Sequence, residues 1–419
     1  MRPCSRSIHR AFSGIRYGLK GRFYTFKAGD HVVLRALKDG HASPIFCKNL
    51  RGGARLDSHK GSIHHDDIIG KDARDIIRTR LKSERGYGTE YRLHEVKLEE
   101  YVRWTRRLVT PLYPQDAQLI VGLLDLHVEA SRSGDANEPK LEILEAGTGH
   151  GALTLYLSRA IHAANLPMPR DDDASDIGGH GMSIQQWKAS RRAVIHSIEL
   201  SPKHSAHAEC VVQGFRHGMY YANVDFHVDS VGDWVAKILQ ERNGSFLSHA
   251  FLDLPGAENH IDVVADAIQT DGTLIVFNPS ITQIMDSLAK VKRMNLALVL
   301  EQVIELGVNG GSGGREWDVR AVKPRSTQKN ASAQSSLSTT VAGAGEEPVP
   351  AGEVAVEEAT DSGVELDKNA EQAIVSNAAP KYTDTDDWKM VCRPKVGGTI
   401  VGGGFLGVFR KHKPKAASL

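Results

Sequence analysis

A glycine-spaced turn after an apolar run offers the clearest chemistry in this sequence. The run at residues 141–144 ends at Glu145, and three glycines then follow at alternate positions. A second apolar run, at 194–198, ends at Glu199. In a doubly wound sheet, a glycine loop after one strand faces a nucleoside, and an acid ending the next strand accepts hydrogen bonds from its ribose hydroxyls. The glycines, whose missing side chains let a ligand lie against the backbone, are Gly147, Gly149 and Gly151.

The spacing of this loop bears on which nucleoside cofactor binds. A dinucleotide site has the pattern G-x-G-x-x-G with an acid about 20 residues further on, whereas this loop is G-x-G-x-G with Glu145 just before it. A carboxylate there would repel a pyrophosphate, but it suits the sulfonium and ammonium groups of S-adenosylmethionine. We therefore expect S-adenosylmethionine, with a dinucleotide or a purely structural turn as the alternatives. The long gap before Glu199 contains residues 167–192, which we expect to be a surface loop.

Composition sets broad limits on the class of protein. The chain has 419 residues, of which 41% are hydrophobic, so it can hold two domains and a tail. The formal net charge is +1, so no bulk field points to a nucleic-acid partner. No apolar run is long enough for a membrane span or a secretory signal. No C-x-x-C pair occurs, which favours reduced thiols in an intracellular protein over disulfides or metal ligands for Cys4, Cys47, Cys210 and Cys392.

The N-terminal residues are basic. Residues 1–29 contain seven Lys or Arg and no acid, with serines and aromatics between them. This composition is typical of an organelle transit peptide, which we place at residues 1–22, and it predicts a mitochondrial protein. A disordered basic arm and a nuclear location are the alternatives.

The rest of the chain divides by pattern. Short β-prone runs at 23–100 resemble a small β-barrel or sandwich. Residues 101–322 and 381–413 alternate β and α signals, which predicts a mostly parallel sheet covered by helices, the Rossmann-like architecture. The acidic tract 323–380 has few large apolar residues, and we expect it to be disordered. We expect it to interrupt a terminal hairpin that has one arm at 317–322 and to act as a solvated spacer. Competition with RNA for basic surface is the alternative.

Histidines and aspartates gather in one short segment of the small β region. A metal site would need a second ligand cluster at usable spacing, and the sequence offers none. We therefore expect polar turn residues and no metal. The five residues are His59, His64, His65, Asp66 and Asp67.

Two further acids end predicted strands. Asp253 closes the run 250–252 and is followed by Pro255, which fixes the backbone and helps to aim the acid outward. Ligands bind at that edge of an open α/β sheet, although an acid there can also simply cap a helix. Asp229 is well placed for the exocyclic amine of a cofactor adenine. Segment 277–280, Phe-Asn-Pro-Ser, leaves the next strand with an aromatic face and polar groups.

With these motifs, the sequence resembles the catalytic subunit of the tRNA adenine-N1 methyltransferases, which make 1-methyladenosine at position 58 in the T-loop. The resemblance covers most of the expected ordered chain and is to a fungal or mitochondrial-like member. Its specific elements are H-D-D-I-x-G-K at 65–71 and Y-P-x-D-A at 113–117. The loop 145–152, the Asp-Leu-Pro at 253–255 and the segment 277–280 also match. One departure is Ala257, where the family often has a second proline, and another is His204, where a basic residue is common.

The resemblance implies a function and a set of site residues. It implies transfer of a methyl group from S-adenosylmethionine to N1 of an adenine in tRNA, with Asp253 as the acid at the target base. It also implies tRNA as partner and assembly as a homo- or hetero-oligomer, typically a tetramer. The implied cofactor contacts are Leu112, Glu145, Gly147, Thr148, Gly149, Gly151, Ala152, Glu199, His204, Asp229 and Asp253. Phe277 or Tyr113 could stack on the base, although core packing is the commoner role.

Two rival functions stay open on the sequence alone. The first is a non-catalytic tRNA-binding subunit, against which the intact set of acids and glycines argues. The second is a methyltransferase acting on protein or small molecules, which the near-neutral charge favours because RNA affinity normally rests on Lys and Arg. The clusters at 103–107 and 290–293 could form local basic patches or solvated helix faces.

Overall fold

A computed structural model describes residues 24–38, 42–81, 88–129, 140–168, 183–307, 317–322, 389–394 and 403–413. The expected transit peptide at 1–22 and the acidic insert at 323–380 therefore lie outside the described residues. The chain separates into two compact units, one of residues 1–314 and 400–419 and the other of residues 315–399.

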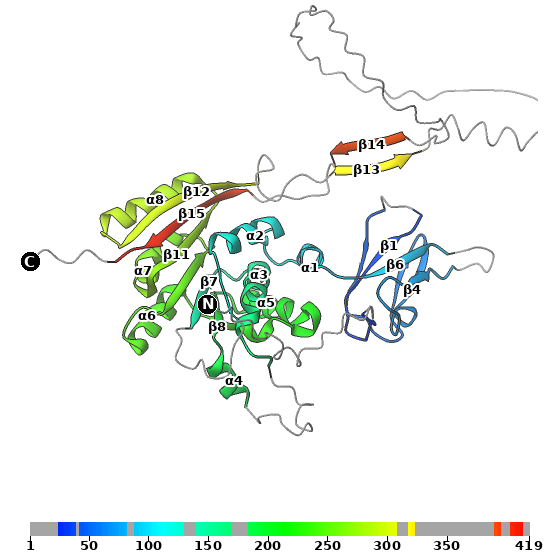
Figure 1. The fold of residues 1–419 in the computed structure, drawn as a ribbon, viewed down its shortest axis with the longest axis horizontal. Helices are drawn as coiled ribbons and strands as arrows, with labels where there is room; N and C mark the ends of the chain where they lie inside the picture. Colours follow the sequence, from blue (N-terminus) through cyan, green and yellow to red (C-terminus); the bar gives the residue numbers. More distant parts are fainter. Residues whose placement is uncertain are drawn as a thin grey trace, which may run out of the picture. The chain divides into compact units, whose positions relative to one another are not determined.

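The larger unit is built on a seven-stranded sheet, in the order β12-β15-β11-β10-β7-β8-β9 (Figure 1). Five neighbouring strands run parallel, and β15 inserts antiparallel between β11 and β12. This confirms the predicted α/β fold. The strands are β7 (Leu141–Ala146), β8 (Ala193–Glu199), β9 (Val224–Val228), β10 (Leu247–Leu252), β11 (Ile268–Asn278), β12 (Leu298–Leu306) and β15 (Gly404–Lys411).

Helices cover both faces of this sheet. One apolar cluster joins the sheet to α2, α3 and α5, and a second joins it to α6, α7 and α8. The predicted surface loop at 167–192 is wrong in part, because its end forms α4, where Trp187 is buried. The helices are α1 (Leu98–Trp104), α2 (Pro114–Leu123), α3 (Ala152–Ile161), α4 (Ile184–Ser190), α5 (Pro202–Gly214), α6 (Val231–Arg242), α7 (Ile261–Ala267) and α8 (Ile281–Arg293).

Serine caps set where helices begin after three of the strands. Ser201, Ser230 and Ser280 each accept a hydrogen bond from a backbone N–H in the first turn of α5, α6 and α8. Such a cap satisfies one of the free amides at a helix start. Each serine is the second residue after its strand, so the residues just before it lie at the carboxyl edge of the sheet.

The N-terminal region forms a small β domain with its own core, around Phe26, Leu34 and Leu93. A four-stranded antiparallel sheet has the order β2-β1-β6-β5, and β3 and β4 form a separate hairpin. A closed barrel is not confirmed, because the described strands leave that sheet open at β2 and β5. The strands are β1 (Val32–Ala36), β2 (Ile45–Cys47), β3 (Arg55–Ser58), β4 (Gly61–His64), β5 (Ile76–Arg78) and β6 (Glu90–Glu95).

The smaller unit contains the interrupted hairpin that the sequence predicts. Strand β13 (Trp317–Val322) pairs antiparallel with β14 (Lys389–Pro394). The last described strand, β15, follows the glycine-rich stretch after β14 and joins the main sheet between β11 and β12. In the described part of the chain, no helix combines the length and apolar character needed to cross a membrane.

Candidate active site

A cavity of about 530 Å³ opens at the carboxyl edge of the central strands. Its lining comes from the ends of β7, β8, β9 and β10 and from the turns that follow them, which is where ligands bind in open α/β sheets. Both acidic and apolar side chains line it. The lining residues are Ala146, Gly147, Ile198, Glu199, Leu200, Ser201, His204, Asp229, Ser230, Val231, Asp253, Leu254, Pro255 and His260.

Glycine is required in the first position of the loop. Gly147 has φ +90°, and a Cβ placed on it would lie 1.9 Å from the backbone oxygen of Asp253. Its N–H donates to the carbonyl of Ile198 at 2.9 Å. Gly151, at φ +81°, begins α3 against Ala208, to which an added Cβ would come within 3.2 Å. The loop therefore packs directly on the turn after β10 and on α5.

Glu199, the acid at the end of β8, holds the glycine loop by hydrogen bonds. One carboxylate oxygen of Glu199 accepts the N–H of Gly149 at 3.1 Å, and the other accepts the N–H of Ser201 at 3.0 Å. His204 Nδ1 lies 3.9 Å from the same carboxylate. Carboxylate oxygens have further lone pairs, so Glu199 can also accept bonds from a ligand in the cavity.

Asp253 lies where the loop and the cavity meet. Its N–H donates to the carbonyl of Ala146 at 2.9 Å, which holds the end of β10 against β7. Burial raises the pKa of its carboxyl group to about 7. A carboxyl group that is half protonated near neutral pH in a ligand cavity is a candidate functional group.

Glu145 lies behind the loop instead of in the cavity. It is 1% exposed, and one of its oxygens accepts hydrogen bonds from Thr154 at 2.6 Å and Ser197 at 2.8 Å. Burial, opposed by these bonds, raises its pKa to about 7, and Asp253 contributes to the rise. The structure therefore gives this acid a supporting position under the loop, where a direct contact with a cofactor cation was expected.

The turn after β9 and the turn after β10 complete the cavity. Asp229 Oδ1 accepts the N–H of Ser230 at 2.8 Å at the start of α6. His260, at the N-terminus of α7, faces the same cavity, and burial lowers its pKa. Sequence reasoning missed His260, although its place seven residues after Asp253, just before a helix, was a usable signal.

The structure brings together five of the predicted site residues as cavity lining: Gly147, Glu199, His204, Asp229 and Asp253. Gly149 and Gly151 belong to the loop but do not line the cavity. Thr148 is buried and shares a hydrogen bond of 2.8 Å with Ser197. Ala152 is buried in α3, and Leu112 packs on the main core. The remaining predicted residue, Glu145, lies beneath the loop as described above.

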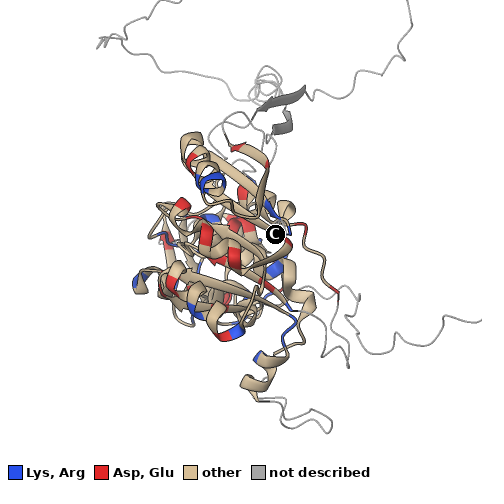
Figure 2. Cartoon of the chain, turned by 90° about the vertical axis from the view of Figure 1, so that its left-hand side faces the viewer, with Lys and Arg blue, Asp and Glu red and all other residues tan. Residues whose placement is uncertain are grey.

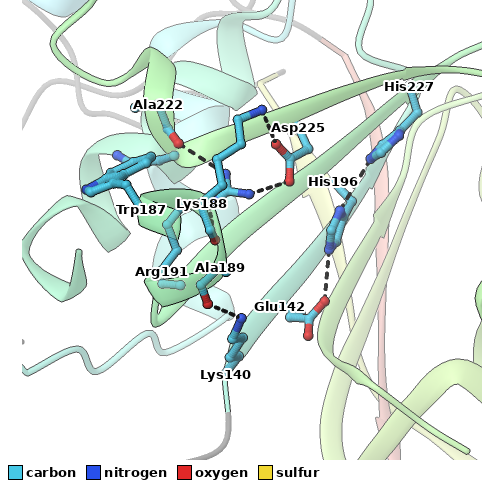
Figure 3. Close-up of polar contacts among 12 residues, drawn as sticks. Lys140, Glu142, Trp187, Lys188, Ala189, Arg191, His196, Ala222, Asp225 and His227 are labelled. Carbon is cyan, nitrogen blue, oxygen red and sulfur yellow. Dashed lines mark hydrogen bonds and ion pairs between the residues drawn. The ribbon is translucent and has the colours of Figure 1, made fainter. Parts of the chain in front are cut away.

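A polar network ties the three strands beneath the site together (Figure 3). His196 of β8 donates to Glu142 of β7 at 2.9 Å, and its other ring nitrogen lies 3.3 Å from His227 of β9. At the start of β9, Asp225 pairs with Arg191 at 2.5 Å. Hydrogen bonding to His196 and Arg242 outweighs burial and lowers the pKa of Glu142. These contacts hold the strands whose ends carry Glu199 and Asp229.

The structure also locates three further groups of residues that the sequence analysis named. Among the described residues no group of three His, Cys, Asp or Glu side chains could hold a metal. In the histidine segment, His65 is buried against Cys47 and accepts the N–H of Arg51, as a structural residue does. Phe277 packs on the main core and Tyr113 lies beneath the Arg107 guanidinium, so neither ring lines the cavity.

The cavity fits S-adenosylmethionine in chemical terms. Glu199 and Asp229 offer acceptors for ribose hydroxyls and an adenine amine, and Ile198, Leu200 and Val231 offer apolar contact for a base. The lining also contains the Asp253 carboxyl group, which as a carboxylate would attract a sulfonium and repel a phosphate. The sheet and this cavity together form a Rossmann-like α/β fold with a site whose chemistry suits that cofactor.

Comparisons with known proteins found relatives by sequence and similar solved structures. No model of a protein family matches the chain. The tRNA (adenine(58)-N(1))-methyltransferase TrmI of Thermus thermophilus is 29% identical over 286 residues, which cover 68% of this chain and 87% of that protein. TrmI of a second strain of the same species matches to the same extent. Among solved structures, the tRNA (m1A58) methyltransferase TrmI of Aquifex aeolicus has TM-score 0.48 at 14% identity, covering 93% of this chain and all of that one. An S-adenosylmethionine-dependent O-methyltransferase of Thermotoga maritima has TM-score 0.47 at 19% identity, covering 69% and 88%.

Proposed function

We propose that this homologue of the TrmI enzymes transfers a methyl group from S-adenosylmethionine to N1 of adenine 58 in the T-loop of tRNA. One observation carries the proposal: Asp253, the family's acid at the target base, lines a cavity whose other acids suit the nucleoside cofactor. The relatives that share most of the chain are named for this reaction.

The bound cofactor supplies an electrophilic methyl group, so that adenine N1 forms the new bond as the sulfur–methyl bond breaks and S-adenosylhomocysteine leaves. The chain's own residues supply alignment, which can account for much of the acceleration in such a displacement. Glu199 holds ribose hydroxyls, and Asp229 accepts from the cofactor's adenine amine. The glycine loop fixes the positions of Glu199 and Asp229 relative to Asp253 through the close contact at Gly147.

Asp253 orients the target base. As a carboxylate it accepts a hydrogen bond from the N6 amino group, which directs electron density toward N1 and holds N1 in line with the methyl group. N1 lies on the Watson–Crick edge, so the base must be unpaired and turned out of its stack to reach the cavity.

The decisive experiment uses the purified chain, isotopically labelled S-adenosylmethionine and unmodified tRNA. Nucleoside mass spectrometry after nuclease digestion is expected to show labelled 1-methyladenosine. Asp253→Ala should lower turnover by orders of magnitude and leave cofactor affinity, measured by calorimetry, within a few-fold. Asp286→Asn, a change at an exposed acid of α8, is the matched control and should leave both unchanged.

Three results would contradict the proposal in distinguishable ways. Cofactor binding without any methylated nucleoside would point to a missing partner subunit or to a protein or small-molecule acceptor. Tight tRNA binding without cofactor binding would indicate a non-catalytic subunit. Unchanged turnover in Asp253→Ala would remove that residue from the mechanism.

We further propose a mitochondrial location and an oligomeric assembly of one or two subunit types. The basic, acid-free composition of residues 1–29 supports the first, and the family resemblance supports the second. A fluorescent fusion of residues 1–30 tests import, with diffuse or nuclear signal counting against it. Light scattering of the purified chain tests assembly, and a monomeric mass would contradict it.

A further inference from the structure

One sheet face of the small β domain gathers cations that lack acidic partners. Strand register places Arg92 of β6 opposite Arg35 of β1 on one side and opposite Ile76 of β5 on the other. Cross-strand partners share a face of the sheet, and like charges directly opposite each other are destabilising. Arg35 is neutralised by an ion pair with Glu100 of α1. Arg92 is exposed and forms no ion pair with any described residue.

Arg74 and Lys97 extend this cluster. A guanidinium nitrogen of Arg74 donates to His94 Nδ1 at 2.8 Å, which keeps His94 neutral on the same strand as Arg92. Burial, together with Arg74, Arg35, Arg92 and Lys97, lowers the pKa of His94 to about 4. Neither Arg74 nor Lys97 pairs with an acid within the described ranges, and both are exposed.

The acids near this face are already engaged. Glu90 pairs with Arg78 at 2.7 Å, Glu95 with Arg216 at 3.3 Å, and Glu100 with Arg35. Three cations and a neutral imidazole are thus left with no counter-charge among the described acids, and their mutual repulsion costs stability. An anionic partner would relieve that repulsion. Ile76, which lies opposite Arg92 on the edge strand β5 and is 47% exposed, adds an apolar contact to this face.

The overall net charge of the chain does not reveal the local excess of positive charge in the small β domain. The net charge is +1, and blue and red positions are interspersed on the face seen in Figure 2. Within the described residues 24–97, however, 13 Lys and Arg stand against 8 Asp and Glu. The excess therefore belongs to the small β domain.

Helix α1 connects the basic sheet face of the small β domain to the glycine loop. It begins directly after Lys97, and its seven residues span roughly 10 Å. Just past its end, Thr105 shares a hydrogen bond of 3.1 Å with His150 of the glycine loop, and the exposed Arg106 follows. An extended polyanion lying on the cation cluster can therefore continue along α1 toward the glycine loop.

We propose that Arg74, Arg92 and Lys97, with His94 between them, form a docking surface for the phosphate backbone of the RNA substrate. The inference rests on the proposed function and adds to it a binding surface outside the cavity. Phosphate contacts position a nucleic acid without reading its sequence, and each one contributes to the salt dependence of binding. The surface would hold the tRNA body while one base enters the cavity.

The test compares the full chain with the double variant Arg74→Gln/Arg92→Gln in binding to an unmodified tRNA transcript over a range of KCl concentrations. Loss of two phosphate contacts is expected to reduce the magnitude of the slope of log K against log[salt] by about 1.4 to 1.8. Affinity at moderate salt should fall about tenfold, whereas cofactor affinity and turnover at saturating tRNA stay within twofold. Lys237→Gln/Lys413→Gln, which removes two exposed cations, one from α6 and one just after β15, is the matched control and should change neither slope nor affinity.

The outcomes separate this inference from the function on which it rests. If the unaltered chain methylates tRNA and Arg74→Gln/Arg92→Gln binds tRNA with the same slope of log K against log[salt], the proposed docking surface is wrong. The proposed function then still stands. An equal loss in the control variant would also overturn the proposed docking surface, because the effect would then come from net charge alone. If the unaltered chain neither binds nor methylates tRNA, the proposed function fails first. Lys97→Gln gives an independent check and should lower the slope by about half as much.

Discussion

Gly147 lies so close to Asp253 that no side chain fits between the glycine loop and the turn after β10. The Cβ of any other residue would lie 1.9 Å from the Asp253 carbonyl oxygen. The glycine loop and the acid at the end of β10, which both line the cavity, are therefore in direct backbone contact. Their spacing is set by backbone contact, with the N–H of Asp253 bonded to Ala146 at 2.9 Å.

Gly147→Ala is expected to separate these two elements. The added methyl group meets backbone atoms, and φ +90° disfavours a side chain, so we expect a loss of about 3 kcal/mol in the free energy of unfolding. Cofactor binding should fall below detection by calorimetry. Gly122→Ala is the control, because Gly122 lies in α2 with open space around it and should gain about 0.5–1 kcal/mol. Normal cofactor affinity in Gly147→Ala would show that the close contact does not matter.

Activity should depend on pH through Asp253. Its folded-state pKa is raised from 3.8 to about 7 by burial, so the carboxylate that accepts from N6 forms only as the pH rises through about 7. We expect kcat/KM to increase across that range and then to level off. Asp253→Asn should have a low rate without this rise. A rate that is flat between pH 6 and 8 would argue against a catalytic carboxylate.

The same shifts predict how stability depends on pH. Glu145 and Asp253 bind protons more tightly in the folded chain than in the unfolded chain, so their contribution to stability is present at low pH and is lost as pH rises through about 7. Glu145→Gln can still accept hydrogen bonds from Thr154 and Ser197, and it should weaken this pH dependence. Chemical denaturation at pH 5 and pH 8 measures the difference, and an unchanged pH dependence would contradict the assignment.

Glu199→Gln is expected to weaken cofactor binding about tenfold or more. Its two oxygens accept the backbone N–H groups of Gly149 and Ser201, and an amide would turn a donor toward one of them. Hydrogen bonds to charged groups contribute about 1.5–3 kcal/mol each. Calorimetry measures the affinity, with Glu241→Gln at an exposed position of α6 as control. Equal affinities for both variants would exclude Glu199 from the cofactor site.

Arg216→Gly should stabilise the chain. Arg216 has φ 45° and ψ 53°, a left-handed conformation that costs a non-glycine residue about 1–2 kcal/mol. Its ion pair with Glu95 is largely exposed, and such pairs contribute about 0–1 kcal/mol. A gain of about 1 kcal/mol in urea unfolding is expected. A net loss in the free energy of unfolding would mean that the Arg216–Glu95 ion pair stabilises the chain by more than is usual for an exposed pair.

Local sequence patterns were sufficient for much of this protein. Alternating apolar runs and helix starts predicted the α/β sheet, because strand and helix periodicity are properties of neighbouring residues. The strand ends at Glu199, Asp229 and Asp253 followed from the same pattern, and the structure places all three around one cavity. The interrupted hairpin of β13 and β14 was also predicted, since both arms carry strand-like composition. The family resemblance rested on short motifs, and the comparisons support it at the level of the family.

Only the tertiary structure decided which of these residues face a ligand. Glu145 lies next to the loop in sequence, yet its side chain points into the core, because alternate residues of β7 point to opposite faces and this one meets Thr154 and Ser197. His260 enters the cavity through the packing of α7, and β15 joins the main sheet although about one hundred residues of chain separate it from β12. The basic face of the small β domain depends on strand register, which places distant cations side by side. Such relationships arise from contacts between residues far apart in the chain, and no local pattern encodes them.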